Sequence, residues 1–130
     1  MSQENVEIVR RGYEHLRRTG ELLWELIDQE ISVHDPPIGP DSRVWHGHDG
    51  LRAAFANVEQ SFDDYGFEAE EFHDAGNEVV VFVRLHGRGR ESGIEVEAPV
   101  AHLWTLRDGK GVRIRVLDRE TALEAAGLRE

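Results

Sequence analysis

The stretch AHLWTLRDGKGVRIRVL, residues 101–117, decides the fold class of this chain. From residue 112 onward, valine and isoleucine alternate with arginine, which is the period of two expected for a strand with one buried face. Asp108 and Gly109 interrupt the pattern with a pair that is typical of tight turns between antiparallel strands. The stretch therefore predicts a β-hairpin.

The same period extends back to Phe67, so the second half of the chain is predicted to be an antiparallel meander. Glycine, asparagine, aspartate and serine cluster in the turns between its strands. The strands are expected near residues 67–73, 78–88, 94–107 and 111–118.

Helical spacing of apolar residues dominates the first half of the chain. It predicts a helix over residues 3–18, with Tyr13 on the buried face and Gly20 just past the end. The apolar run over residues 22–27 predicts a second, short helix that lies deep in the molecule.

A short strand and a third helix are expected before the meander begins. Alternation over residues 31–35 predicts a strand whose inward face ends in Asp35. Prolines and glycine break regular structure over residues 36–42, and helical spacing returns from Gly47 to Phe62. A final helical turn or two is expected over residues 121–126.

Helices early and strands late indicate an α+β fold, with one domain over residues 1–130. We expect a curved antiparallel sheet that wraps the N-terminal helix pair. A cavity at the open end of such a sheet is suited to an apolar ligand.

Composition narrows the range of partners. The formal charge of −11 would repel the phosphate backbone of nucleic acids and anionic membrane surfaces. The absence of cysteine excludes disulfides, thiolate nucleophiles and thiolate metal sites. No apolar run approaches the roughly 20 residues that span a bilayer, and the first residues lack a signal-peptide pattern, so we expect a cytoplasmic location without a membrane partner.

Five strings occur in the order found in the nuclear transport factor 2-like superfamily: residues 4–13, 33–36 (VHDP), 45–48 (WHGH), 98–104 (APVAHLW) and 107–110 (RDGK). Across nearly its whole length the chain resembles the SnoaL-like polyketide cyclase and ketosteroid isomerase branch of that superfamily. The resemblance implies a cone-shaped fold around one pocket. Members share this cone without sharing one reaction.

The resemblance also implies catalytic residues. Asp35, ahead of a proline, matches the general base of the isomerases, and Tyr13, seven residues before Gly20, matches their donor to the substrate oxygen. The isomerases' third residue, a protonated aspartate, falls at Ala101, which disfavours steroid isomerisation. Asp118 is the nearest match to the late-strand aspartate of the cyclases.

Each of these residues also has a structural interpretation. Asp35 would cap the turn at the following prolines, and Tyr13 would belong to the core. Apolar residues expected to line the pocket, or else to fill the core, are Trp24, Trp45, Phe55, Phe82, Ala101 and Leu103.

Histidines at positions 34, 46, 48 and 102 raise a metal site as an alternative. His46 and His48 lie where a helix begins, so we expect neither a metal nor a cofactor. If Ala101 faces the pocket, His102 and Trp104 face outward by strand alternation. An apolar outer face of that kind predicts a homodimer.

Two hypotheses about function follow. In the first, a cofactor-independent isomerase or cyclase binds a small apolar molecule and moves a proton with Asp35, assisted by Tyr13. In the second, the chain is a non-catalytic module for ligand binding or dimerisation, and Asp35 is structural. The first requires Asp35 and Tyr13 to share one pocket.

Overall fold

The computed structural model describes residues 2–36 and 43–128, so most of the predicted loop over residues 36–42 lies outside the described residues. In chain order the elements are α1 (Ser2–Thr19), the 3₁₀ turn η1 (Trp24–Leu26), β1 (Ile27–His34), β2 (Val44–His46), α2 (Gly47–Glu59), β3 (Phe62–Ala75), β4 (Glu78–Gly89), β5 (Glu95–Arg107), β6 (Lys110–Leu117) and α3 (Arg119–Ala125). Within the described residues, three helices and a six-stranded sheet confirm the α+β class.

The sheet has the strand order β2-β1-β6-β5-β4-β3. Its last four strands form the predicted antiparallel meander. The expectation of a purely antiparallel sheet is wrong, because β1 pairs with β6 in parallel and with the short strand β2 in antiparallel orientation. The sheet is therefore mixed, and β2 was not predicted.

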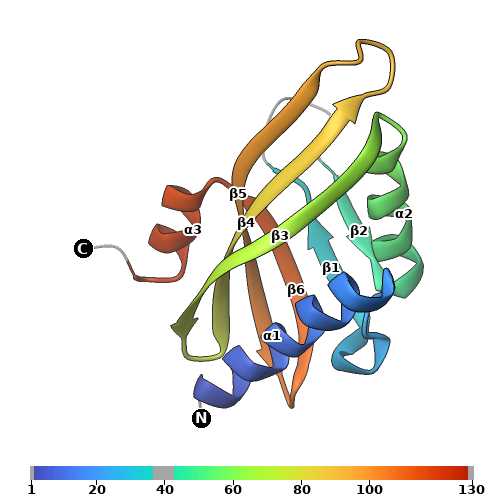
Figure 1. The fold of residues 1–130 in the computed structure, drawn as a ribbon. Coiled ribbons are helices and arrows are strands. Elements are labelled where there is room, and N and C mark those ends of the chain that lie inside the picture. The colour runs from blue at the N-terminus through green and yellow to red at the C-terminus, as the bar shows by residue number, and fades with distance from the viewer. Residues whose placement is uncertain (1, 37–42, 129–130) are drawn as a thin grey trace.

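The sheet curves around α1, as Figure 1 shows. Two shifts of register lie in β3, between Asp63 and Gly66 and between Ala69 and Glu71. Irregularities of this kind bend a strand and increase its twist. The curvature leaves a concave face, which α1 crosses, and a convex face on which α3 lies.

The first helix ends where the sequence predicts. Gly20 has a positive φ of 77°, and its N–H donates to the carbonyl of Leu16, which closes the last turn. Val9 and Tyr13 face the sheet and pack against valines of β4.

The second predicted helix is wrong, because only the turn η1 is helical and Ile27 already pairs with Gly111 in the sheet. The third helix ends at Glu59, and Phe62 instead pairs with Gly89 at the start of β3. In both places strand pairing in the folded sheet overrides the local sequence pattern that predicted a helix. The concave face is therefore covered by α1 and α2.

The convex face carries a separate apolar cluster beneath α3. Val80, Ala101, Leu103 and Leu117 are buried there against Ala122. In the part of the chain that is described, no helix is long and apolar enough to cross a membrane.

Candidate functional site

An inner cavity of about 70 Å³ lies between α1 and the concave face of the sheet. Its wall is almost entirely apolar, and among the described residues that line it only Tyr13, His102 and Trp104 contribute polar side-chain atoms. The lining residues are Ile8, Val9, Gly12, Tyr13, Leu16, Leu22, Leu23, Leu26, Ile27, Leu51, Phe55, Phe67, His102, Trp104, Leu106, Gly111 and Ile114.

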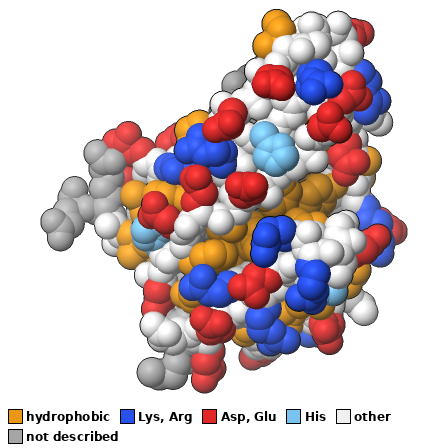
Figure 2. All heavy atoms as spheres, viewed as in Figure 1, with side chains coloured by type: hydrophobic (Ala, Val, Ile, Leu, Met, Phe, Trp, Pro, Cys, Tyr) orange, Lys and Arg blue, Asp and Glu red, His pale blue; other side chains and the backbone are white. Residues whose placement is uncertain are grey.

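A wide outer cleft of about 1070 Å³ adjoins the cavity. The two share five wall residues, which are Tyr13, Leu16, Leu22, Phe55 and Phe67. Figure 2 shows apolar side chains in a hollow surrounded by charged ones. The cleft therefore gives a ligand a route from solvent to the inner cavity.

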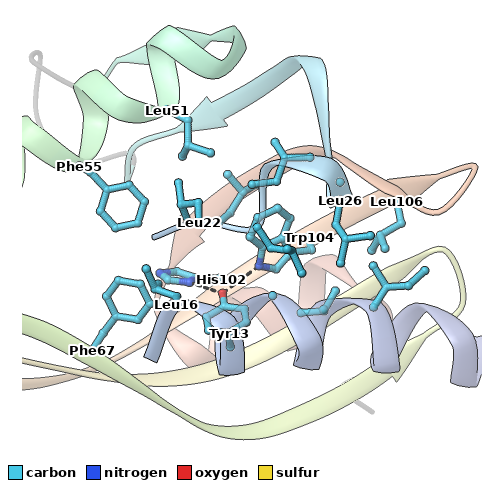
Figure 3. A pocket seen from close by; sticks show the side chains of 17 residues that line it. Tyr13, Leu16, Leu22, Leu26, Leu51, Phe55, Phe67, His102, Trp104 and Leu106 are labelled. Carbon is cyan, nitrogen blue, oxygen red and sulfur yellow. Dashed lines mark hydrogen bonds between the residues drawn. The ribbon is translucent and has the colours of Figure 1, made fainter. Parts of the chain in front are cut away.

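Three polar side chains form one hydrogen-bonded cluster at the cavity wall (Figure 3). The Nε1–H of Trp104 donates to the Tyr13 hydroxyl oxygen over 2.8 Å. The same hydroxyl lies 2.6 Å from Nδ1 of His102. The cluster also contacts aromatic rings. Both Tyr13 and His102 contact the ring of Phe67 edge-on.

Burial controls the charge of this cluster. Desolvation lowers the pKa of His102 to about 4, so its imidazole is neutral at neutral pH. Desolvation raises the pKa of Tyr13 well above its usual range, and the hydrogen bond from Trp104 opposes only part of that shift. The cavity therefore offers neutral hydrogen-bonding groups and no charge.

Each member of the cluster is positioned by regular structure. His102 and Trp104 lie two residues apart on β5, so both point to the concave face, where α1 brings Tyr13 to them. A Cβ atom on Gly111 of the neighbouring strand would lie 2.7 Å from the indole of Trp104. Glycine at that position leaves room for the ring.

Of the residues predicted to form the site, Tyr13 and Phe55 reach the inner cavity. Trp24 lies on the wall of the outer cleft instead. Its ring packs against His48 at 4.7 Å between centroids, and the guanidinium of Arg52 lies 4.3 Å from its centre.

Asp35 and Trp45 lie together, away from the inner cavity. The Trp45 Nε1–H donates to Asp35 Oδ1 over 3.1 Å, and the Asp35 N–H donates to the Arg43 carbonyl. Neither residue lines the cavity or the cleft. The expected convergence of Asp35 with Tyr13 on one pocket is thus not what the structure has.

The remaining predicted residues lie on the convex side. Ala101 and Leu103 are fully buried under α3, and Phe82 packs between His73 and Arg119. Asp118 caps α3 by accepting from the Thr121 N–H and hydroxyl, which holds the pKa of its carboxyl below the usual range.

The prediction that His102 and Trp104 face outward is therefore wrong. The alternation along β5 is as expected, but α3 covers the Ala101 side and α1 covers the His102 side. The apolar surface that predicted a homodimer lies inside the protomer, which removes that argument for a dimer. Strand alternation in the sequence places His102 and Trp104 on the same face of the strand. It does not indicate whether that face is the concave or the convex one.

The histidines do not form a metal site in the part of the chain that the structure describes. His48 Nε2–H donates to the Ile27 carbonyl, and His34 shares a hydrogen bond with Ser32. Among residues 2–36 and 43–128, no group of three histidine, aspartate or glutamate side chains is arranged to hold a metal ion.

Comparison with known proteins agrees with this architecture. The chain belongs to the family of SnoaL-like domains, whose model matches residues 9–114. Among curated proteins, no sequence matches the chain.

Solved structures with the same fold cover most of the chain. An NTF2-like protein from Burkholderia thailandensis E264 is 25% identical, with a TM-score of 0.77 and coverage of 95% of this chain and 96% of the other. A protein assigned to the SnoaL-like polyketide cyclases, from Jannaschia sp. CCS1, is 22% identical, with a TM-score of 0.73 and coverage of 99% and 94%.

A third structure contains a ligand. It is a protein with a ketosteroid isomerase-like fold from Catenulispora acidiphila DSM 44928, in complex with trimethylamine. It is 16% identical to this chain, with a TM-score of 0.70 and coverage of 95% and 94%. At this identity the likeness concerns the fold alone.

Proposed function

We propose that this protein binds a small, largely apolar molecule in the inner cavity and holds it against the Tyr13–His102–Trp104 cluster. The observation that carries the proposal is an apolar cavity with one compact group of neutral polar side chains in its wall. Ligand sites commonly combine an apolar wall with a few polar groups that fix orientation.

Size and access support the same function. The inner cavity takes only a small group, while the adjoining cleft leaves room for the rest of a larger molecule. A ligand would therefore enter through the cleft and bury one end beside His102.

Gly12 allows a direct test. It lies on α1 in the cavity wall, and a Cβ atom there would meet nothing within 4 Å. Gly12→Leu fills part of the cavity, whereas Gly12→Ala adds only one methyl group and serves as its matched control. Both changes replace glycine inside a helix, so neither is expected to unfold the protein.

Cyclohexanone is a suitable probe, with the Trp104 indole N–H signal in NMR spectra as reporter. We expect saturable shifts of this signal in the wild type and in Gly12→Ala, and none in Gly12→Leu. The indole of Trp45, which donates to Asp35 outside the cavity, is the internal reference. Equal binding by the wild type and Gly12→Leu would contradict the proposal.

Cofactor-independent isomerase or cyclase chemistry is a second candidate. It is favoured by the neutral imidazole in an apolar cavity wall, where a hydrogen-bond donor stabilises negative charge that develops on a ligand oxygen. The reaction would begin with transfer of a proton from the carbon next to a carbonyl group to a base from solvent that enters through the outer cleft. The electron pair of the broken C–H bond would move onto the carbonyl oxygen, which accepts a hydrogen bond from His102.

Exchange of the α-protons of cyclohexanone in D₂O tests this candidate without knowledge of the natural substrate. Catalysis predicts exchange faster than in buffer, with most of the gain lost in His102→Asn and little lost in Asp35→Asn. Loss in Asp35→Asn alone would return the role of base to Asp35. Exchange at the buffer rate would leave ligand binding as the function.

A further inference from the structure

We infer that the ligand of the inner cavity presents a hydrogen-bond acceptor, such as a carbonyl oxygen, to Nε2–H of His102. The inference rests on the proposed function and names the ligand class that the site selects. It follows from counting the protons in the Trp104–Tyr13–His102 cluster.

Trp104 fixes the first proton. An indole nitrogen only donates, so its 2.8 Å contact makes the Tyr13 oxygen an acceptor. Tyr13 has one proton of its own, and the described residues offer it one acceptor, His102 Nδ1 at 2.6 Å. If Nδ1 carried a proton instead, the hydroxyl proton of Tyr13 would be buried without a partner, which costs free energy. Tyr13 therefore donates, and Nδ1 accepts.

The remaining imidazole proton then lies on Nε2. A neutral imidazole carries one proton, and burial keeps His102 neutral. Within the described part of the chain, no group hydrogen-bonds Nε2. Figure 3 shows the ring edge opposite Tyr13 directed toward Phe55 and Phe67, whose rings stack at 5.9 Å between centroids.

The site is thus a donor site. Both acceptors that face the cavity, the Tyr13 oxygen and His102 Nδ1, already receive a proton from within the cluster. An ammonium group of a ligand would therefore find neither of these two acceptors free. A carbonyl oxygen, by contrast, would accept a hydrogen bond from Nε2–H. Selection against a partner that leaves polar groups unpaired is a strong source of specificity.

Three six-membered rings of similar shape test the inference: cyclohexanone, methylenecyclohexane and cyclohexylammonium. Dissociation constants are measured from the Trp104 indole signal. The ketone and the alkene differ in hydrophobicity, so their dissociation constants are not compared directly. The decisive quantity is the ratio of the two dissociation constants, measured in the wild type and again in His102→Asn.

His102→Asn keeps an acceptor oxygen near the position of Nδ1 and removes the donor at Nε2. We expect the preference for the ketone over the alkene to fall about two- to tenfold in this variant, which is the range of one hydrogen bond. Binding of methylenecyclohexane should persist, and cyclohexylammonium should bind most weakly to the wild type.

Tyr13→Phe is a second variant, should His102→Asn fail to fold. It frees the imidazole to place its proton on either nitrogen, so the ketone preference should again fall. An unchanged ratio in the folded variants, or tighter binding of cyclohexylammonium than of the ketone, would overturn the inference and leave apolar binding intact. Failure of all three probes to shift the wild-type signal would overturn the proposed function as well.

Discussion

At the scale of single residues, the protein keeps the imidazole of His102 neutral in the pH range where most histidines gain a proton. His102 is buried, its neighbours in the cavity wall are apolar or aromatic, and its one hydrogen-bond partner among the described residues is the hydroxyl of Tyr13. Burial disfavours the charged form, so the unfolded chain binds a proton at this position more readily than the folded protein.

This difference predicts a loss of stability in acid. The pKa of His102 is about 4 in the folded protein and near 6.5 unfolded, so the free energy of unfolding should fall as pH drops from about 6.5 to 4. The full effect is roughly 3 kcal/mol. Urea unfolding at several pH values measures it.

The control is a comparison of variants. His102→Asn should flatten the profile in this pH range, while His34→Gln, which removes a more exposed histidine with a lowered pKa, should flatten it less. The carboxyl pKa values of Glu70 and Asp118 are lowered, so these carboxylates stabilise the folded protein until they are protonated. Their contribution to the free energy of unfolding is therefore lost only at more acidic pH. An unchanged slope in His102→Asn would refute a neutral, buried His102.

Tyr13→Phe should destabilise the protein by about 1–3 kcal/mol, because the indole N–H of Trp104 and Nδ1 of His102 both lose their partner. Tyr65→Phe is the matched control, since the Tyr65 hydroxyl has no hydrogen bond within the described residues. Urea unfolding of both variants measures the difference. Equal small losses would show that the cluster adds no stability.

At the scale of elements, α1 closes the concave face of the sheet and carries both Tyr13 and Gly12 into the cavity wall. Gly12→Ala should therefore raise the free energy of unfolding by about 0.5–1 kcal/mol, because glycine inside a helix costs conformational entropy and the new methyl group meets no atom. Thermal or urea unfolding checks this. Destabilisation would mean that the helix needs glycine for close packing.

The sequence predicted α1 and the meander well, because each has a long run of one period. It failed where a short apolar segment fits two structures. Residues 22–27 form an apolar run that fits a short, buried helix, but Ile27 gains its pairing with Gly111 only in the folded sheet. Phe62 likewise continues the spacing of α2 and yet begins β3.

The site was harder to predict than the fold, for the same reason. Helical spacing places Tyr13 and Phe55 on buried faces, and the resemblance alone gives Tyr13 a role in the site, whereas His102 was predicted on the wrong face of β5. Alternation shows which residues of a strand share a face, but it does not show which helix covers that face. The Tyr13–His102 contact joins positions 89 residues apart and has no local signature.

At the scale of the whole molecule, the charge of −11 acts on any charged ligand that approaches. Five glutamates and three arginines line the outer cleft: Glu14, Glu21, Glu59, Glu68, Glu70, Arg10, Arg17 and Arg52. The entrance therefore has the same sign as the whole chain and disfavours anions.

Salt should separate charged from neutral ligands. The affinity for 4-oxocyclohexanecarboxylate should rise with ionic strength, because salt screens its repulsion over a length of about 10 Å at 0.1 M. Cyclohexanone should bind equally at low and high salt. Titrations between low salt and 0.5 M would reveal the difference, and a fall in the affinity of the carboxylate with salt would instead indicate capture by the cleft arginines.

The most direct measurement is the ¹⁵N NMR spectrum of His102 in the labelled wild-type protein at neutral pH, before and after cyclohexanone is added. A protonated Nε2, an unprotonated Nδ1 and a ligand-induced shift of the Nε2 signal are the predicted results. A proton on Nδ1, or an Nε2 signal that saturating cyclohexanone leaves unmoved, would contradict a cavity that binds its ligand through His102.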